Sequence, residues 1–318
     1  MQRRVKYAAN IKTTAAQQHY YRVPSDVVAE FLAYLRAQRI PDIPESLTPA
    51  TLSLSYETAL GDVEDAATPV ISRIIASESL HELASADRLA LSVFLAVQSV
   101  RTPSTRRNAA NASEQLRTFV SEHARAAGHD PAHVLAVMGA DTASAASPPH
   151  TALSLLETAP AMAPLFAEKT WVLLRTTNAT LFVIGDNPLT RISHQPLNVQ
   201  QVRGTLGLRS LGIELAMPLS PTLCLLMLCP TVAARITAEA ARLAPRAWWC
   251  VTAPVEPGTW QLTAALAQSF RTGDPVDIAP IIAAEYNARQ VDAAERQVMS
   301  NSADFEFVEP LLNSDPGR

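Results

Sequence analysis

Residues 212–229 read GIELAMPLSPTLCLLMLC, and this stretch decides what kind of core the protein builds. Two apolar runs flank Ser220 and Pro221, a pair of residues that favours turns. Glu214 and the prolines interrupt the segment, so it is unsuited to a membrane-spanning helix. We therefore expect a pair of strands over residues 212–229, inside a soluble protein.

A second strand pair is predicted upstream, as a hairpin over residues 170–186. The runs TWVLLRT and TLFVIGD are rich in β-favouring residues, and Asn178 between them tolerates the left-handed conformation of a tight turn. The run TLFVI is apolar throughout, which predicts a strand buried on both faces. We expect Asp186 to lie at the C-terminal end of this strand, with its side chain directed toward the helices of the N-terminal half.

The N-terminal half has helical periodicity from Pro24 to about Ala140. In PSDVVAEFLAYLRAQ, apolar residues recur at the spacing of one helix face. The segment SADRLALSVFLAVQSVR is apolar nearly all round, so we expect it to be a central helix, which Pro103 terminates. Near the C-terminus a further helix is predicted over residues from about 278 to 299.

These elements predict an α+β protein. An N-terminal helical lobe, residues 1–145, is expected to pack on a small, mainly antiparallel sheet with C-terminal helices, residues 151–318. Between them, residues 141–150 read DTASAASPPH and mark a linker or a surface loop. We expect the two lobes to form one compact unit.

Composition narrows the classes of function. The 318 residues are 48% hydrophobic and 18% charged, with a formal net charge of −4, so the chain folds and a broad surface for nucleic acid is not expected. No phosphate-binding loop, dinucleotide fingerprint or nucleophile elbow occurs, and only 10 glycines are present. The three cysteines lie in apolar settings and no secretory signal is visible, which favours the cytoplasm. No cofactor is identified, and a protein partner stays open.

Five segments, in this order, resemble a known family. They are YETALGDVEDAATPVISRII, DRLALSVFLAVQSVRTPSTR, WVLLRTTNATLFVIGDNPL, IELAMPLSPTLCLLML and YNARQVDAAERQV. Together they resemble the bacterial domain-of-unknown-function family 4238 over roughly residues 16–300. The most specific pieces are Arg101-Thr102-Pro103 and Asp186-Asn187-Pro188. The resemblance implies no established activity.

The N-terminus departs from the pattern of that family. Its members typically open with a His-x-x-Pro motif, followed by an aromatic and basic stretch. Here AAQQHYYRVP resembles the segment after that motif, and His19 and Pro24 stand five residues apart, so the motif is not assigned. We expect a shortened member or a trimmed start, and any catalytic groups of the missing segment would be lost.

Asp186 and Asn187 are candidate catalytic residues. The end of a strand holds a carboxylate on a rigid support, which suits a general base or a metal ligand. Beside Gly185 and Pro188, however, the same two residues also favour a purely structural turn. The residues alone leave both interpretations open.

Glu57 and Glu64 are further candidate catalytic residues, because they lie seven residues apart and share a helix face. They could act as an acid/base pair, or they could form a solvated face paired with arginine. In either case we expect Arg101 to lie within salt-bridge reach of Glu57, Glu64 or Asp186.

Arg101, Thr102, Gln98 and Arg106 are candidate substrate-binding residues at the end of the central helix. Guanidinium groups grip phosphate or carboxylate through paired hydrogen bonds. An arginine in the last turn of a helix also complements the negative end of the helix dipole without any ligand.

A metal site is not predicted. His129 and His133 have the i, i+4 spacing of a zinc pair, but the sequence supplies no third ligand and no glutamate between them. We interpret them as a surface pair.

Two hypotheses for function follow. In the first, Asp186 and the glutamates face Arg101 across a pocket between the lobes and hydrolyse a phosphate-containing substrate, such as nucleic acid or a nucleotide. In the second, the same residues form a structural ion-pair network in a non-catalytic binding or interaction module. Carboxylates open to solvent would favour the enzyme, and carboxylates enclosed against arginines would favour the module.

Overall fold

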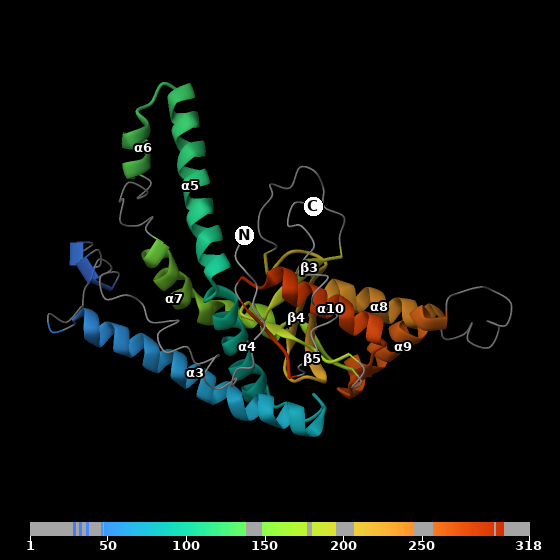
Figure 1. Ribbon diagram of the computed structural model, residues 1–318. Helices are drawn as coiled ribbons and strands as arrows, with labels where there is room; N and C mark the ends of the chain where they lie inside the picture. Colours follow the sequence, from blue (N-terminus) through green and yellow to red (C-terminus); the bar gives the residue numbers. More distant parts are fainter. Residues whose placement is uncertain are drawn as a thin grey trace. The chain divides into compact units, whose positions relative to one another are not determined.

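A computed structural model describes residues 28–29, 32–33, 36–37, 46, 48–137, 148–176, 180–194, 207–243, 257–295 and 297–301. The chain forms two compact units. The first contains Met1–Asp62 and Thr105–Glu157, and the second contains Val63–Ser104 and Thr158–Arg318. Figure 1 labels the helices α3 to α10 and the strands β3, β4 and β5.

The first unit is helical in the part that the structure describes. Most of the long helix α5 (Pro103–Ala126) belongs to it, and α6 (Pro131–Val137) follows after a turn. The helices α3 (Pro49–Ser77) and α7 (Pro148–Ala167) each run from one unit into the other. As the Thr-Pro pair indicates, α3 begins at Pro49, and the hydroxyl of Thr48 accepts the N–H of Thr51 at 3.2 Å.

The second unit is built on a five-stranded, mainly antiparallel sheet with the strand order β3-β4-β5-β1-β6. A second sheet consists of the two strands β2 and β7, and β7 follows α10 in the chain. The strands are β1 (Thr170–Arg175), β2 (Ile184–Gly185), β3 (Thr190–Ser193), β4 (Ile213–Pro218), β5 (Leu223–Leu228), β6 (Val276–Asp277) and β7 (Val298–Met299). The predicted α+β class is therefore confirmed.

The predicted strand pair over residues 212–229 is confirmed as β4 and β5, which pair antiparallel. Every residue of both strands is buried, because other elements cover the two faces of the sheet. The turn between the strands is closed by Ser220, whose hydroxyl accepts the N–H groups of Thr222 at 3.2 Å and Leu223 at 3.0 Å.

The predicted hairpin over residues 170–186 is wrong. β1 pairs with β5 along its whole length, and on its other edge Leu174 and Arg175 pair with β6. Within that stretch only Ile184 and Gly185 form a strand, and they pair with β7. An apolar run is compatible with a strand, but which edge it meets depends on segments that lie far away in the chain.

Two rows of side chains cross the sheet on opposite faces. The first row is Arg191, Leu215, Met227 and Trp171, which are directly opposite one another in β3, β4, β5 and β1. The second row, one residue along, is Ile192, Glu214, Leu228 and Thr170. Because side chains alternate along a strand, the two rows face different layers of the unit.

Helix α4 (Ser85–Val100) crosses the face that carries the first row. The guanidinium of Arg88 lies over the ring of Trp171, 4.2 Å from its centroid, and Arg191 donates to the carbonyl of Ser99 at 3.3 Å. Arg88 and Ser99 are separated by about 16 Å of helix, and four strands cover about 14 Å. The helix therefore spans the whole row.

Helix α10 (Pro280–Ala293) covers the other face and contacts β2 and β3. The remaining helices of the unit, α8 (Pro230–Leu243) and α9 (Pro257–Thr272), pack against each other, and α9 also contacts β1 and β6. The helix predicted over about 278–299 is shorter than expected, because the chain leaves α10 after Ala293 and enters β7.

The observed division into units differs from the predicted one, which placed a single boundary between residues 145 and 151. Residues 63–104, which include α4, belong with the sheet and not with the N-terminal helices. α4 is apolar nearly all round because its buried side chains complete the core of the sheet unit.

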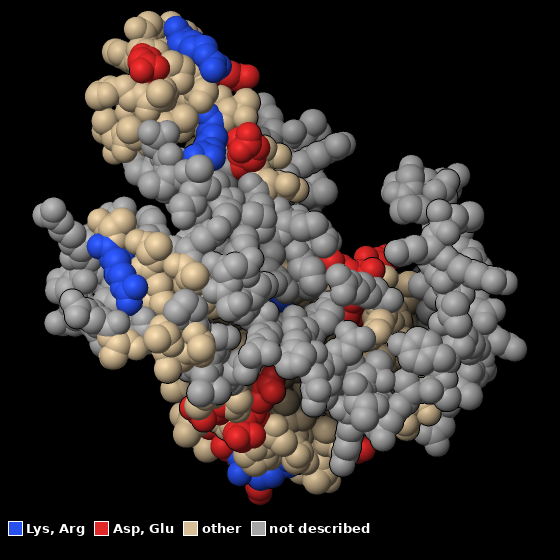
Figure 2. Space-filling view, turned by 60° about the vertical axis from the view of Figure 1, so that its left-hand side comes forward, with Lys and Arg blue, Asp and Glu red and all other residues tan. Residues whose placement is uncertain are grey.

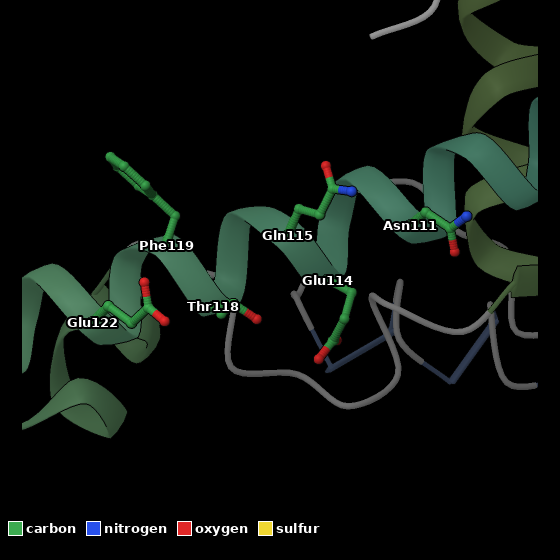
Figure 3. A pocket seen from close by; sticks show the side chains of 6 residues that line it. All are labelled: Asn111, Glu114, Gln115, Thr118, Phe119 and Glu122. Carbon is green, nitrogen blue, oxygen red and sulfur yellow. The ribbon is translucent and has the colours of Figure 1, made fainter. Parts of the chain in front are cut away.

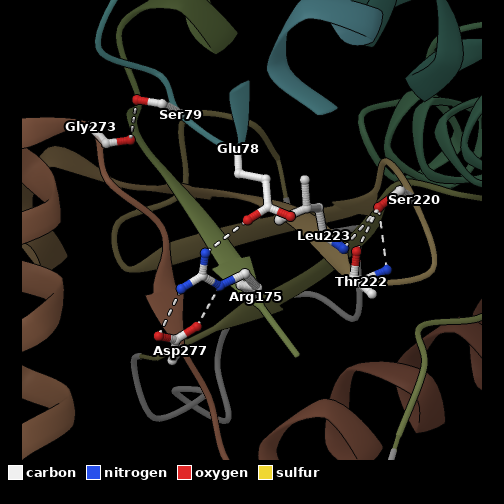
Figure 4. A network of polar contacts seen from close by, with 8 residues as sticks. All are labelled: Glu78, Ser79, Arg175, Ser220, Thr222, Leu223, Gly273 and Asp277. Carbon is white, nitrogen blue, oxygen red and sulfur yellow. Dashed lines mark hydrogen bonds and ion pairs between the residues drawn. The ribbon is translucent and has the colours of Figure 1, made fainter. Parts of the chain in front are cut away.

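Arg175 of β1 forms ion pairs that join the loop before α4 to the sheet, as Figure 4 shows. Its guanidinium pairs with both oxygens of Asp277 at 2.6 and 2.9 Å, and with Glu78 at 2.8 Å. In the same loop the N–H of Leu80 donates to the carbonyl of Gly273 at 2.9 Å. These contacts join the end of α3, β1 and β6.

Candidate functional site

Glu214 is the centre of the candidate site. It is the charged residue of the buried strand β4, and its side chain is 6% exposed. One carboxylate oxygen accepts from Arg289 at 2.6 Å and from the hydroxyl of Tyr286 at 3.1 Å, and the other is 2.7 Å from Nε2 of His194. A buried carboxylate is thus held by three polar side chains.

Local structure explains why these residues meet. His194 follows β3 and lies two residues beyond Ile192, the partner of Glu214, so it projects from the same face of the sheet. Tyr286 and Arg289 are three residues apart in α10 and share the helix face that covers β3. The guanidinium of Arg289 also lies 4.5 Å from the centroid of the Tyr286 ring.

The surroundings keep Glu214 ionised and Tyr286 protonated. Burial alone would raise the pKa of Glu214, but the hydrogen bond from His194 and the charge of Arg289 outweigh burial and lower it. Burial, together with the neighbouring charge of Glu214, raises the pKa of Tyr286 well above its ordinary value. Because an ionised carboxylate only accepts hydrogen bonds, Nε2 of His194 carries the proton that lies between them.

Two members of the cluster reach solvent. The side chain of His194 is 35% exposed and that of Arg289 is 25% exposed. Nδ1 of His194 makes no hydrogen bond to any residue that the structure describes. A buried carboxylate that orients a partly exposed imidazole is the arrangement of a general base.

The sequence does not single out this cluster. Glu214 stands in it as an interruption of an apolar run, and His194 and Tyr286 belong to no recognisable motif. The available signal was the acidic residue inside a strand that is otherwise apolar, since such a charge requires partners when it is buried. Its partners come from segments about 20 and about 70 residues away, and the sequence does not reveal that proximity.

The predicted ion pair of Arg101 is confirmed. Its Nη1 lies 2.5 Å from Oε1 of Glu64, with the arginine side chain 14% exposed and the glutamate 48% exposed. Gln98 and Thr102 are buried beside it. Glu57 lies in α3 and Arg106 in α5, but their side chains are outside the described residues. The catalytic and substrate-binding roles of all these residues stay predictions.

Asp186 and Asn187 form a turn after β2 and are partly buried. The backbone N–H of Asp186 donates to Gln297 at 3.0 Å, and its side chain accepts the N–H of Glu295 at 2.8 Å. This hydrogen bond ties the carboxylate to the end of α10, which differs from the predicted orientation toward the N-terminal helices. It favours the structural interpretation of the turn.

The apolar stretch before Asp186 receives its hydrogen bonds from α10. Asn287 accepts the N–H of Val183 at 3.0 Å and donates to the carbonyl of Leu181 at 2.8 Å. Gln290 accepts the N–H of Gly185 at 3.0 Å and donates to the carbonyl of Pro188 at 2.8 Å. Side-chain amides thereby replace the strand partner that the predicted hairpin would have supplied.

Among the described residues, no group of three or more histidine, cysteine, aspartate or glutamate side chains could hold a metal ion. His129 and His133 are both exposed, in the turn and helix that follow α5. A pocket of the described part lies along α5, where Figure 3 shows six side chains of that helix. Its lining residues are Asn111, Glu114, Gln115, Thr118, Phe119 and Glu122. They include none of the predicted site residues.

Charged side chains of both signs lie on the face that Figure 2 draws. On the face drawn in Figure 2, the described Lys and Arg side chains are interspersed with Asp and Glu. None of the described helices combines the length and the apolar character needed to cross a membrane.

Comparison with known proteins places the chain in a family. No curated protein and no solved structure gives a significant match. A family profile described as a protein of unknown function, DUF4238, matches residues 1–304, which is most of the 318 residues. The chain therefore belongs to the DUF4238 family.

Proposed function

We propose that the protein is a hydrolase acting on a phosphate-containing substrate, such as a nucleotide or nucleic acid, with His194 as the general base and Arg289 binding the phosphate oxygens. One observation carries this proposal. The buried carboxylate of Glu214 holds a partly exposed imidazole on one oxygen and a partly exposed guanidinium on the other. The base and the anion-binding group are thereby fixed close to each other.

His194 takes the proton in this reaction. Because Nε2–H is bonded to Glu214, Nδ1 is the nitrogen that accepts a proton from water. The water oxygen forms a bond to phosphorus while the bond from phosphorus to the ester oxygen breaks. The departing oxygen takes a proton from solvent, and His194 afterwards returns its own proton to solvent. The negative charge of Glu214 stabilises the imidazolium that forms.

Arg289 supports the charge that develops on the phosphate. Its Nη1 donates to Glu214, and Tyr286 lies beside the guanidinium. The remaining donors match the spacing of phosphate oxygens. Contact with the ring of Tyr286 restricts the guanidinium to one orientation.

This proposal keeps the reaction class expected from the sequence and changes the residues that perform it. Asp186, Asn187, Glu57 and Glu64 stay predicted catalytic residues without a geometric argument of this kind. The side chain of Asp186 accepts the N–H of Glu295, which supports a structural turn at this position.

The test is hydrolysis of phosphate mono- and diesters, nucleotides and single-stranded nucleic acid by the purified full-length protein. We expect turnover of at least one of them, and a fall of kcat by roughly 10²–10⁴-fold in His194→Gln, the range that a general base contributes. Arg289→Lys keeps the charge but loses the paired hydrogen bonds, and should raise KM.

His129→Gln is the matched control, because it removes an exposed histidine that has no described role. Its kcat should equal that of the wild type. Absence of hydrolysis of every substrate in the panel, or equal kcat in His194→Gln and the wild type, would contradict the proposal.

A non-catalytic binding module is the second candidate. It is favoured by the observation that Glu64 and Glu214 are each paired with an arginine. In that case His194→Gln and Glu214→Gln would lower stability and leave no activity to lose.

A further inference from the structure

Three helices carry the chain between the first unit, called the helical unit below, and the second unit, which holds the sheet. α3 crosses after Asp62, α5 after Ser104 and α7 after Glu157. A regular helix is stiff, because hydrogen bonds from each N–H to the carbonyl four residues earlier join every turn to the next. The state of these bonds near each crossing therefore decides how firmly the helices hold the two units together.

The crossing in α3 contains a glycine. Gly61 directly precedes Asp62, inside a helix of 29 residues. Glycine loses more backbone freedom in a helix than any other residue, so it weakens the helix interior. A Cβ at Gly61 would meet nothing within 4 Å, so close packing does not require glycine here. What glycine contributes at this position is lower helix stability at the crossing.

The crossing in α7 contains a proline. Pro160 lies inside the helix, three residues after Glu157. Because proline has no N–H, it cannot donate to the carbonyl of Leu156 on the other side of the boundary. Its ring also crowds that carbonyl, and helices bend at such positions. Pro164 repeats the defect one turn later.

The crossing in α5 follows a break between two helices. α4 ends at Val100 and α5 begins at Pro103, so Arg101 and Thr102 separate them. Pro103 has no N–H with which to continue the hydrogen bonds of α4. Each of the three crossings thus has, within three residues of the unit boundary, a residue that weakens or interrupts a helix.

The ion pair of Arg101 with Glu64 fixes the chain on the sheet-unit side of two crossings. Glu64 stands two residues beyond Asp62, and Arg101 stands three residues before Ser104. Nη1 of the arginine lies 2.5 Å from Oε1 of the glutamate. α3 and the end of α4 are therefore joined to each other next to the points at which the chain changes unit.

We propose that the three crossings form a hinge, at which the helical unit changes its orientation while the sheet unit keeps its structure. Residues 61–62, 101–104 and 157–160 take up the change in backbone angles, as the ends of elements do in hinged proteins. All four members of the Glu214 cluster belong to the sheet unit, so the motion leaves that site intact. The hinge goes beyond the hydrolase proposal and does not depend on it.

The test is pulsed electron paramagnetic resonance on the full-length protein, which measures the distribution of distances between two spin labels. Unnatural amino acids carry the labels, so the native cysteines stay in place. One pair of labels joins Arg125 of the helical unit to Arg235 of the sheet unit, both exposed positions. The reference pair joins Arg235 to Glu285, within the sheet unit. We expect a broader distribution for the first pair than for the reference pair.

Two variants stiffen the crossings. Gly61→Ala and Pro160→Ala introduce a residue that favours helix, and each should narrow the distribution between the units. In Gly61→Ala, hydrogen exchange of amides 62–65 should slow about fivefold, the factor that the difference in helix propensity implies. This variant meets no steric obstacle, so it serves as the test if Pro160→Ala does not fold. Thr118→Ala also favours helix but lies within α5 away from the crossings, and as the matched control it should leave the distribution unchanged.

Two outcomes would overturn the inference. One is a distribution between the units as narrow as that within the sheet unit, which would mean that the crossings are rigid. The other is an unchanged distribution in both Gly61→Ala and Pro160→Ala, which would place the motion elsewhere in the chain.

Discussion

The ionised carboxylate of Glu214 is stabilised in an apolar strand by donors that arrive from two other elements. His194 and Arg289 outweigh the effect of burial and lower the pKa of Glu214 below its ordinary value of 4.5. Between that value and the lower pKa of the folded state, the unfolded chain binds more protons than the folded chain. The contribution of Glu214 to stability is therefore complete above the unfolded pKa and is lost as the pH falls through the folded pKa.

The variant Glu214→Gln tests whether the ionised carboxylate of Glu214 stabilises the folded protein. At neutral pH we expect a loss on the order of 3 kcal/mol in the free energy of unfolding, because Arg289 loses its anion. Urea unfolding at several pH values should show a shallower decline in acid for the variant than for the wild type. Parallel pH profiles of the two proteins would mean that Glu214 is not ionised in the folded state.

Arg101 illustrates a different balance, because its partner is accessible to water. A buried network would make Arg101→Ala cost about 3–5 kcal/mol. Since Glu64 is 48% exposed and regains water, we expect about 1 kcal/mol instead, in part from lost packing of the arginine stem. Urea unfolding measures this loss, with Arg73→Ala, which breaks an exposed pair with Asp87, as the comparison. A loss above about 3 kcal/mol in the free energy of unfolding would show that Glu64 is left as a buried charge without a partner.

At the scale of elements, the end of α9 fits closely against the loop that follows α3. Gly273 has φ +74, and a Cβ there would come within 2.5 Å of the backbone nitrogen of His81. The carbonyl of Gly273 also accepts hydrogen bonds from Leu80 and Ser79, the latter at 3.4 Å. Close approach of two backbones therefore requires glycine at this position.

Gly273→Ala is expected to destabilise the protein by roughly 3 kcal/mol, from left-handed strain of about 1–2 kcal/mol and from the steric conflict. Gly128→Ala is the matched control, because Gly128 has φ +76 but nothing within 4 Å of its Cβ position. It should show the strain alone. Thermal unfolding of both variants makes the comparison, and equal losses would mean that the loop moves aside.

At the scale of the whole molecule, the chain passes between its two units within helices. The boundaries at Asp62, Ser104 and Glu157 fall inside α3, α5 and α7. A division read from helical periodicity assigns α4 to the N-terminal lobe, whereas the contacts assign it to the sheet unit. Helical character alone does not reveal which core a helix completes.

Leu95→Ala in α4 tests this assignment. Leu95 is fully buried, so we expect a loss of about 2–5 kcal/mol, together with faster amide hydrogen exchange in β1, β4 and β5. If residues 63–104 belonged to the N-terminal helices, exchange in the strands would not change. Exchange followed by mass spectrometry reports both regions in one experiment.

The sequence by itself determined the features that depend on short stretches. Continuous apolar runs around Ser220 predicted β4 and β5, and the Thr-Pro pair predicted the start of α3, because turn chemistry and burial act over a few residues. The ion pair of Arg101 with Glu64 was also predicted, since a charge at the end of an apolar helix requires a partner.

Only the tertiary structure decided the features that join distant segments. The apolar run before Asp186 does not pair with β1, and its backbone N–H groups donate to Asn287 and Gln290 of α10. The cluster around Glu214 likewise combines three elements. Long-range pairing follows from which surfaces fit together in the folded chain, and no local pattern of residues carries that information.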